Sequence, residues 1–530
     1  METIDPAAGA ETLFDALVAS AARAPAAPAL VDAAGTTTFA GLHAQVLAVA
    51  RYLRERGIGP GDAIAMQLPN SRGFVVTLLA AGALGASVQM LHMPYRRAEL
   101  TALIGHGRPQ AFVGLQAFKE ETPIATVEAL GTVDIVLAID ALMARVDATS
   151  IETRGAVVGD AAGVAADRDA VAFAAVDPDA RFVLLHTSGT TAEPKGVPVT
   201  HRQFLGNARS ALEPLQIRGD DVLLAAAPFT HLYGLFVLEM AILQGACVSL
   251  LPAFTPADFI ARLSADRVSA VFAGPAHVRP LLADPVSARA SMRNLRLVCL
   301  SGTAVPAALA AEVESLLEHG SVIQLWGMTE LQAGSYGRPD DEVALRHHTA
   351  GRPSPGTELR IRAIENDVAR VPAGVEGVLQ VRGPSLFNGY LDNEAATRAA
   401  FDDGWFETGD LALLTEEGAL VLTGRIKEII NRGGVKFNPI EIEALIDRMP
   451  GVGCSAIVPM PDPVLGERAC VFIEPAPAGS EPSLAAIVAM LDEAGVARYK
   501  WPERLEIVET MPMTPTRKVM RGRLAARLAG

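Results

Sequence analysis

Apolar and polar positions follow helical and strand-like spacing in turn along the first part of the chain. Residues 11–23 and 39–56 carry apolar side chains at helical spacing, and residues 62–67 form a short apolar run typical of a strand. The longest uncharged run, residues 73–95, has a length that could span a bilayer, but Gly, Ser, Gln and His residues interrupt it. We expect a buried helix followed by a strand there, and no membrane span.

From residue 181 the alternation of strand and helix patterns becomes regular. Helical stretches such as residues 256–267 and 306–320 separate several of the apolar runs. These runs read RFVLLH, DVLLAAA, ACVSLL, VSAVFAG, LRLVCLSG and SVIQLWG. Strands that are joined by helices through short loops pair in parallel, with right-handed crossovers. We therefore expect an α/β fold whose ligands bind beyond the carboxyl ends of the strands.

The pattern changes twice in the last third of the chain. After residue 351 short strands follow one another with Gly and Pro turns, which predicts a small β-barrel or sheet layer. After Arg425 a helix and further strands indicate a separate α+β domain. We predict a large N-terminal domain of parallel-type α/β sheets plus the β-barrel layer over residues 1–425, and a smaller mobile α+β domain over residues 426–530.

Composition narrows the classes of function. The chain has 530 residues, half of them hydrophobic, and a formal net charge of −15. That charge argues against nucleic acid or an anionic membrane as the main partner. None of the four cysteines forms a C-x-x-C pair, and Cys247 and Cys299 lie in apolar runs, so we expect buried, reduced thiols. With no signal peptide apparent at the N-terminus, this predicts a cytoplasmic location.

The most distinctive stretch is TSGTTAEPKG, residues 187–196, which follows a strand-like run. It is not the P-loop of NTPases, because no glycine directly precedes Lys195 and no Ser or Thr directly follows it. Its glycines still allow close backbone approach to anionic oxygens, and its lysine supplies positive charge to phosphates. The alternative is a surface turn with a solvated lysine. The candidate phosphate-binding residues are Thr187, Ser188, Gly189, Thr190, Thr191 and Lys195.

This stretch resembles the signature of the adenylate-forming superfamily, which includes acyl-CoA synthetases, adenylation domains of peptide synthetases and luciferases. Further motifs of that superfamily follow in the same order, and the resemblance covers almost the whole chain. They are APFTHLYG (227–234), LSGTAVP (300–306), LWGMTE (325–330), WFETGD (405–410), GRIKEIINRGGVKFNPIEIE (424–443) and TPTRK (514–518). The resemblance implies an AMP-forming acyl-CoA ligase. Such an enzyme converts a carboxylic acid and Mg·ATP to an acyl-adenylate and pyrophosphate, and then transfers the acyl group to coenzyme A (CoA).

The resemblance also implies roles around ATP. Glu330 would hold Mg²⁺, and Thr329 would lie beside the α-phosphate. Trp326, which replaces the family's usual tyrosine, would stack on adenine, whereas alone it reads as a core aromatic. Asp410, helped by Arg425, would bind the ribose hydroxyls, although without the family it is an ordinary turn aspartate. The remaining nucleotide contacts implied are Gly302, Thr303 and Gly327.

In the C-terminal part the resemblance singles out Lys518. Its ammonium would reach the acid carboxylate and the α-phosphate, where negative charge builds during adenylation. Arg517 stands where the family has a glycine, which leaves the conformation of that loop open. Lys427 occupies the family's hinge, about which the C-terminal domain rotates between the two half-reactions. The residues implied near the CoA arm are Arg432, Gly433 and Gly434.

The acid pocket is implied by the same motifs. His231 would gate the acid tunnel, whereas a lone histidine is usually structural. The candidate pocket segments are residues 231–240, 274–280, 301–306 and 327–335. Their charged residues besides Glu330 are Glu239 and Arg279, and nothing in the sequence shows that either faces the pocket. The segments are mostly apolar, which favours an apolar aromatic, alicyclic or medium-chain acid. The implied pocket residues are His231, Tyr233, Gly302, Gly327, Met328 and Gly334, and the implied catalytic residues are Lys518, Glu330, Thr187 and His231.

Other functions stay open from the sequence. An acyl-AMP ligase that loads a carrier-protein thiol differs from a CoA ligase only in its acceptor. A luciferase-like oxygenase has no positive feature here. A non-catalytic nucleotide-binding protein on the same fold would be favoured by loss of Lys518, Glu330 or Asp410, and all three are present. We expect a monomer or a homodimer.

Overall fold

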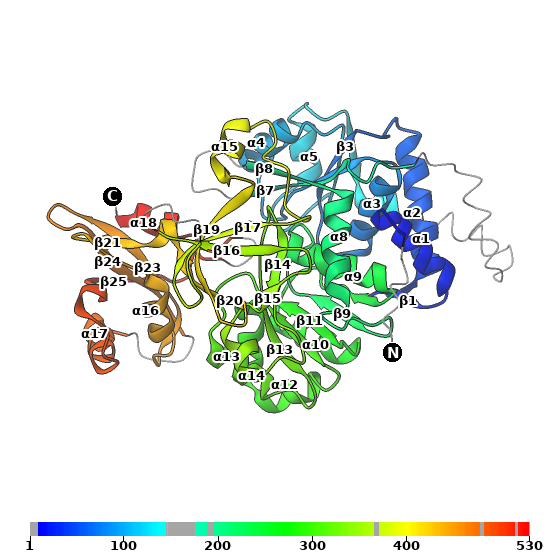
Figure 1. Ribbon diagram of the computed structural model, residues 1–530. Helices are drawn as coiled ribbons and strands as arrows, with labels where there is room; N and C mark the ends of the chain where they lie inside the picture. Colours follow the sequence, from blue (N-terminus) through cyan, green and yellow to red (C-terminus); the bar gives the residue numbers. More distant parts are fainter. Residues whose placement is uncertain are drawn as a thin grey trace. The chain divides into compact units, whose positions relative to one another are not determined.

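The structure of the protein is a computed structural model, and its chain divides into two compact units (Figure 1). Unit 1 contains residues 1–347, 351–357 and 383–399, and unit 2 contains residues 348–350, 358–382 and 400–530. The structure describes residues 9–144, 146, 175–187, 195–364, 370–476, 482–514 and 518–528.

The larger sheet of unit 1 has nine strands within the described residues, in the order β15-β14-β13-β12-β11-β9-β10-β1-β2. The pairs from β13 through β1 are parallel, and the outer pairs are antiparallel. The strands are β1 (Pro28–Asp32), β2 (Gly35–Thr38), β9 (Val222–Ala225), β10 (Cys247–Ser249), β11 (Ala270–Ala273), β12 (Leu297–Leu300), β13 (Ser321–Met328), β14 (Gln332–Tyr336) and β15 (Arg352–Pro353).

The second sheet of unit 1 has six strands within the described residues, in the order β6-β5-β3-β4-β7-β8. All its pairs are parallel except the β7–β8 hairpin. Its strands are β3 (Ala63–Gln67), β4 (Ser87–Met90), β5 (Ala111–Gly114), β6 (Ile135–Ala138), β7 (Arg181–Thr187) and β8 (Lys195–Thr200). The regular pattern that starts at residue 181 is thus divided between two sheets, because apolar runs predict strands but not their partners.

Helices cover the sheets of unit 1. The first three begin at the hydroxyl caps Thr12, Thr38 and Ser71. They are α1 (Leu13–Arg23), α2 (Phe39–Arg54), α3 (Arg72–Ala83), α4 (Arg97–Gly107), α5 (Pro123–Glu128), α8 (His201–Leu212), α9 (Leu232–Gln244), α10 (Pro256–Ala265), α11 (Pro275–Val278), α12 (Pro285–Ser291), α13 (Ala307–Glu314), α14 (Val343–His348) and α15 (Glu394–Ala400), with a short 3₁₀ helix η1 (Arg279–Ala283).

Two of these helices, α3 and α9, are apolar on all sides and buried almost throughout. The expected buried helix and strand within residues 73–95 are confirmed as α3 and β4. No helix among the described residues is long and apolar enough to cross a membrane. By contrast, α10, α12 and α13 lie beside the strands β11 to β13 (Figure 1). Phe259, Leu309 and Val313 are among their buried residues, which pack in one cluster with residues of these strands.

Unit 2 contains two five-stranded sheets within the described residues. The first has the order β16-β17-β19-β18, with β20 paired to β19, and the second has the order β22-β21-β24-β23, with β25 paired to β24. The strands are β16 (Glu358–Arg362), β17 (Gly377–Arg382), β18 (Phe401–Asp402), β19 (Trp405–Leu414), β20 (Leu420–Arg425), β21 (Ile430–Arg432), β22 (Val435–Phe437), β23 (Val452–Asp462), β24 (Gly466–Pro475) and β25 (Arg504–Ile507).

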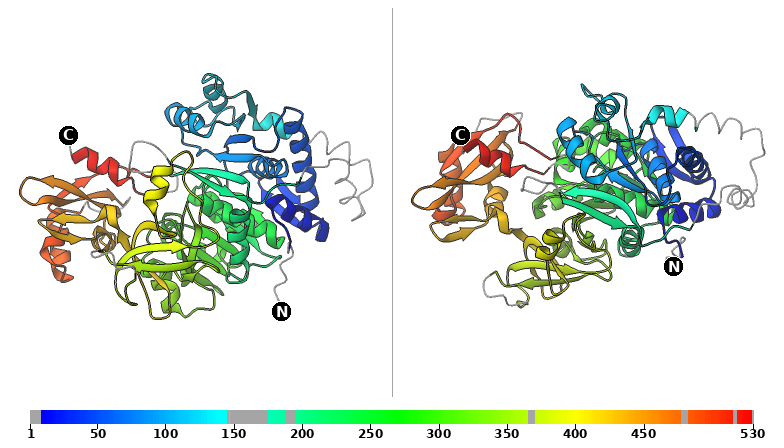
Figure 2. Two further views of the ribbon diagram at one scale, coloured as in Figure 1. Left: turned by 45° about the horizontal axis from the view of Figure 1, so that its top comes forward. Right: turned by 90° about the horizontal axis from the view of Figure 1, so that it is seen from above.

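The second sheet of unit 2 is covered on both faces, as alternate residues of its strands show. Ile457 and Val471 pack in one cluster, which includes Ile442 and Ile487, while their neighbours along β23 and β24 pack around Leu524. The covering helices lie on opposite faces of the sheet (Figure 2). They are α16 (Pro439–Ile446) and α17 (Leu484–Glu493) on one face and α18 (Arg521–Leu528) on the other, and the 3₁₀ helices are η2 (Ile426–Glu428) and η3 (Arg498–Lys500).

The predicted fold class is confirmed, because the molecule is mixed α/β with a larger N-terminal and a smaller C-terminal part. Cys247, Cys299 and Cys470 are buried, Cys454 is half-buried, and none of these described cysteines is in a disulfide.

Candidate active site

The β7–β8 hairpin positions the lysine of the candidate phosphate loop. β7 ends at Thr187 and β8 begins at Lys195, and the two residues face each other across the hairpin. The next residue, Gly196, accepts a hydrogen bond at its carbonyl from the Leu391 N–H at 2.8 Å. Ser188, Gly189, Thr190 and Thr191 lie outside the described residues, so their contacts with phosphate stay a prediction.

Tyr390 contacts both charged candidates of unit 1. The Lys195 Nζ lies 4.6 Å from the centroid of the Tyr390 ring. At the other end of the side chain, the Tyr390 hydroxyl donates to Glu330 Oε1 at 2.9 Å. Burial and the charge of Glu330 raise the pKa of Tyr390 above its usual value, so the hydroxyl keeps its proton and acts as a donor. Sequence reasoning missed Tyr390, because its GYLDN context carries no motif with an assigned chemistry.

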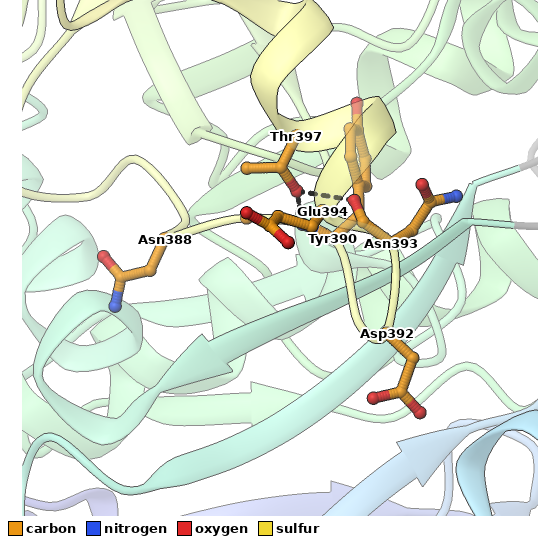
Figure 3. Close-up of a pocket in the computed structure, with 7 residues that line it drawn as sticks. Asn388, Tyr390, Asp392, Asn393, Glu394 and Thr397 are labelled. Atoms are coloured by element: carbon orange, nitrogen blue, oxygen red, sulfur yellow. Dashed lines mark hydrogen bonds between the residues drawn. The ribbon is translucent and has the colours of Figure 1, made fainter.

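A pocket of about 440 Å³ lies at the segment that carries Tyr390 (Figure 3). The backbone of this segment is held by Thr397, whose Oγ1 accepts from the Tyr390 N–H and donates to the Asn393 carbonyl, both at 2.9 Å. The pocket is lined by Asn388, Gly389, Tyr390, Asp392, Asn393, Glu394 and Thr397. The lining is polar and partly acidic, so it is not the apolar acid pocket that the sequence predicts.

Glu330 lies in the turn between β13 and β14 and is only 8% exposed, so it is not a surface carboxylate. Its carbonyl accepts from the Phe387 N–H at 2.8 Å. Ala333 lies on the next strand, β14, and Asn207 lies on α8. The side-chain amide of Asn207 donates to the Ala333 carbonyl at 2.9 Å and accepts from the Ala333 N–H at 3.1 Å. These bonds hold the backbone on either side of the Glu330 side chain.

Trp326 and two glycines shape the strands around Glu330. Trp326 is 5% exposed, and a Cβ at Gly334 would lie 2.5 Å from its Cζ3 atom. A Cβ at Gly327 would lie 2.1 Å from the Gln332 carbonyl oxygen. Both positions therefore require glycine, and the indole packs against the backbone of β14. Thr329 and Met328 are half-buried beside them, and stacking of Trp326 on adenine stays a prediction.

On the acid side, His231 caps the start of α9. Its Nδ1 accepts from the Tyr233 N–H at 3.2 Å, which fixes the tautomer with the proton on Nε2. Tyr233 is buried, and its hydroxyl donates to the Cys299 carbonyl at the end of β12, at 2.8 Å. Burial raises its pKa well above the usual value. Gly302, with φ +94°, and the exposed Thr303 follow β12 at the same sheet edge.

Glu239 lies in the middle of α9 and is 1% exposed. Neither of its carboxyl oxygens has a hydrogen-bond partner among the described residues. Burial raises its pKa well above the usual value, which favours the neutral form of the side chain.

In unit 2, Asp410 and Arg425 face each other on β19 and β20. The Arg425 Nε donates to Asp410 Oδ1 at 2.8 Å, and Asp410 is 6% exposed. Asp410 therefore lies in a strand with a cationic neighbour and is not a turn aspartate, which corrects the reading made without the family. The resemblance paired the same two residues at the ribose.

The other candidates of unit 2 lie on turns and short strands. Lys427 is exposed in η2. Arg432 forms an ion pair with Glu503 and donates to the Tyr499 carbonyl at 3.1 Å. Gly433 and Gly434, with φ of +61° and +90°, make the turn between β21 and β22, where glycine is favoured.

Lys518 closes a loop with Thr514. Its N–H donates to the Thr514 hydroxyl at 3.0 Å, and its carbonyl accepts from the Thr514 N–H at 2.7 Å. Arg517 lies outside the described residues, so its effect on the loop stays open.

The donor set fits Mg²⁺ delivered with ATP. No group of three His, Cys, Asp or Glu side chains in the described part of the chain could hold a metal by itself. Mg²⁺ commonly binds one or two carboxylates together with phosphate oxygens and water. Glu330 fits that role, because carboxylate oxygens are ligands that Mg²⁺ prefers.

Comparisons with known proteins show the family of the chain. Residues 17–391 match the family model of the AMP-binding enzymes, and residues 441–518 match that of the AMP-binding enzyme C-terminal domain. The chain is 29% identical to a medium-chain fatty-acid–CoA ligase of Escherichia coli (strain K12), over 97% of this chain and 90% of that protein. It is 33% identical to a salicylyl-CoA synthase / salicylate adenylyltransferase of a Streptomyces species, over 94% of this chain and 90% of that protein.

A solved structure extends the comparison to the fold. ATP-bound MatB from Rhodopseudomonas palustris superposes with a TM-score of 0.84 at 26% identity, over 98% of each chain. The motifs, the fold and both family models agree, and the chain belongs to the AMP-binding enzymes of the adenylate-forming superfamily.

Proposed function

We propose that this enzyme is an AMP-forming acyl-CoA ligase. In the first half-reaction a carboxylate oxygen of the acid attacks the α-phosphorus of ATP, and pyrophosphate leaves. In the second, the thiol sulfur of CoA attacks the acyl carbonyl, the thiol proton is lost, and AMP leaves. The observation that carries the proposal is the pairing of Lys195 and Glu330 through Tyr390, in a family member whose relatives include CoA ligases.

The proposed roles follow from charge and position. Lys195 binds the β- and γ-phosphates, together with the hydroxyls and N–H groups of residues 187–191. Glu330 holds the Mg²⁺ that neutralises phosphate charge when ATP is bound. Asp410 and Arg425 bind the ribose, and Trp326 and Thr329 contact the adenine and the α-phosphate. Catalysis then consists of positioning and electrostatics, with no nucleophile from the enzyme.

Lys518 acts in the first half-reaction, where its ammonium stabilises the charge on the pentacoordinate phosphorus. Rotation about Lys427 then replaces it with the Gly433–Gly434 turn, which leaves room for the CoA arm. The positive φ angles of Gly433 and Gly434 support the tight turn proposed for the CoA arm.

The acid that fits best is apolar. Every residue of α9 from Leu232 to Leu243 is buried, and the hydroxyl of Tyr233 on that helix donates to a backbone carbonyl. His231, Met328 and the glycines at 302, 327 and 334 border the same sheet edge. An aromatic, alicyclic or medium-chain acid suits such a lining, and the relatives named for salicylyl and medium-chain fatty acyl groups fall in this range. A cytoplasmic location and a monomeric or homodimeric state remain predictions.

The test is AMP release from Mg·ATP across a panel of carboxylic acids, each with and without CoA. We expect release that requires both CoA and an apolar acid, and the acid that responds defines the substrate class. Pyrophosphate exchange that depends on the acid, without turnover on CoA, would show a carrier-protein thiol as the acceptor. No nucleotide turnover or exchange with any acid would contradict the proposal.

A further inference from the structure

The Tyr390 side chain lies between the two charged residues proposed for Mg·ATP. Its ring face meets the Lys195 ammonium at 4.6 Å, and its hydroxyl donates to the Glu330 carboxylate at 2.9 Å. In the described part of the chain Lys195 forms no ion pair with Glu330, although the two opposite charges share one neighbour. All three residues belong to unit 1.

The backbone around Tyr390 is held without help from this side chain. Leu391 donates to Gly196, Phe387 donates to Glu330, and Tyr390 itself donates through its N–H to Thr397, at 2.8 to 2.9 Å. The Phe387 ring packs edge-on against the Tyr390 ring, with centroids 4.8 Å apart, and a phenylalanine would preserve that contact. The hydroxyl therefore contributes little to the fold, and its partner is a carboxylate with a proposed chemical role.

The electrostatics of the arrangement are complementary at both ends. The negative face of an aromatic ring attracts a cation, and the O–H dipole points its positive end at a carboxylate. A buried carboxylate that lacks a donor is costly, and a bond to a charged partner is stronger than a neutral one. Without the ring between them, Lys195 and Glu330 would be drawn into a direct ion pair. Such a pair would occupy both charges before ATP arrives.

We propose that Tyr390 is a positioning residue for Mg·ATP. Its hydroxyl orients Glu330 for the metal, and its ring keeps Lys195 apart from Glu330 and available to the phosphates. The inference rests on the proposed nucleotide site, and it assigns a role to a residue outside the motifs found in the sequence.

Two substitutions separate the two ends of the side chain. Tyr390→Phe keeps the ring over Lys195 and removes the bond to Glu330, whereas Tyr390→Leu removes both. The control is Tyr336→Phe, because Tyr336 is a fully buried tyrosine of unit 1 whose hydroxyl is 3.5 Å from a backbone carbonyl. Binding of ATP is measured by calorimetry at a series of Mg²⁺ concentrations, without acid or CoA, and the midpoint of thermal unfolding is measured for each variant.

We expect Tyr390→Phe to raise the Mg²⁺ concentration at half-saturation about 10-fold, as loss of a hydrogen bond to a charged group implies. Its affinity for ATP without Mg²⁺ and its unfolding midpoint should match the wild type. Tyr390→Leu should in addition weaken binding of metal-free ATP about 3-fold, from loss of the cation–π contact. Tyr336→Phe should leave the Mg²⁺ dependence unchanged.

An unchanged Mg²⁺ dependence in Tyr390→Phe, beside a wild type that binds Mg·ATP, would overturn this inference alone. So would an equal loss of affinity with and without Mg²⁺, since that is what a merely structural role produces. A wild type that binds no Mg·ATP would instead overturn the nucleotide site itself, and with it the proposed function.

Discussion

Glu330 and Glu239 are both buried carboxyl groups of unit 1, yet their surroundings differ in every other respect. Glu330 lies in a turn at a sheet edge and receives a hydrogen bond from Tyr390. Glu239 lies within an apolar helix, and neither oxygen has a partner among the described residues. Burial alone therefore does not identify a functional carboxylate. The partner does, because a donor holds the charged form in one orientation at the place where a ligand can use it.

The two environments differ in what they offer a carboxyl group. Desolvation without compensation favours the neutral form, so the pKa of Glu239 is raised well above its usual value. Glu330 has a donor beside it and a lysine on the far side of that donor. We interpret Glu330 as a carboxylate whose charge has a role at the nucleotide site, and Glu239 as a buried carboxyl group whose charge has none.

The largest effect is expected from Glu330→Gln. The amide keeps the size of the side chain and can still accept from Tyr390, but it does not supply the negative charge for Mg²⁺. Acid-dependent pyrophosphate exchange should fall roughly 10²- to 10³-fold, the range seen when one preorganised electrostatic contact is lost. Glu239→Gln is the matched control and should keep most of the exchange rate. Equal losses in both variants would break the comparison.

The second largest effect is expected from Lys518→Ala, which removes a positive charge proposed to act in adenylation only. Acid-dependent pyrophosphate exchange should fall about 10²-fold, since the ammonium acts on charge that develops during adenylation. Thioester formation from supplied acyl-adenylate and CoA should stay largely intact. The two rates are measured separately on the same preparation, and an equal loss in both would show that the lysine is misplaced.

A smaller effect is expected at Asp410, a buried carboxylate whose partner is a cation. Asp410→Asn should raise the KM for ATP about 10-fold and change kcat less, as expected for a lost charged hydrogen bond to bound nucleotide. Steady-state kinetics at saturating acid and CoA give both constants. If kcat falls alone, Asp410 acts on the reaction and not on ribose binding.

The smallest effect on turnover, but a distinct effect on stability, is expected from Glu239→Gln. The pKa of Glu239 is higher in the folded state than its unfolded value of about 4.3. Below about pH 4.3 Glu239 is therefore neutral in both states and costs no stability, and above it the free energy of unfolding falls as pH rises. The variant should therefore be more stable than the wild type at pH 8, and the gap should shrink toward pH 5, by at most about 1.4 kcal/mol per pH unit. Denaturant unfolding at both pH values measures the gap, and a gap independent of pH would show that Glu239 is charged in the fold.

Much of the fold follows from the sequence, because helix and strand periods are local properties of the chain. The buried helix and strand within residues 73–95 are an example. The division of the strands between two sheets does not follow, since β7 pairs with β4 through contacts between distant segments. Apolar runs favour strands without naming their partners.

The candidate site also has features that follow from local sequence and features that depend on contacts between distant segments. The sequence by itself determined the family, the phosphate motif with Lys195, and the candidacy of Glu330, because these depend on residue types at fixed spacing. Only the tertiary structure decided that Tyr390, 60 residues beyond Glu330, meets both of them. It also decided that Glu239 has no hydrogen-bond partner among the described residues, since desolvation and hydrogen bonding depend on what the fold places around a group and not on its neighbours in the chain.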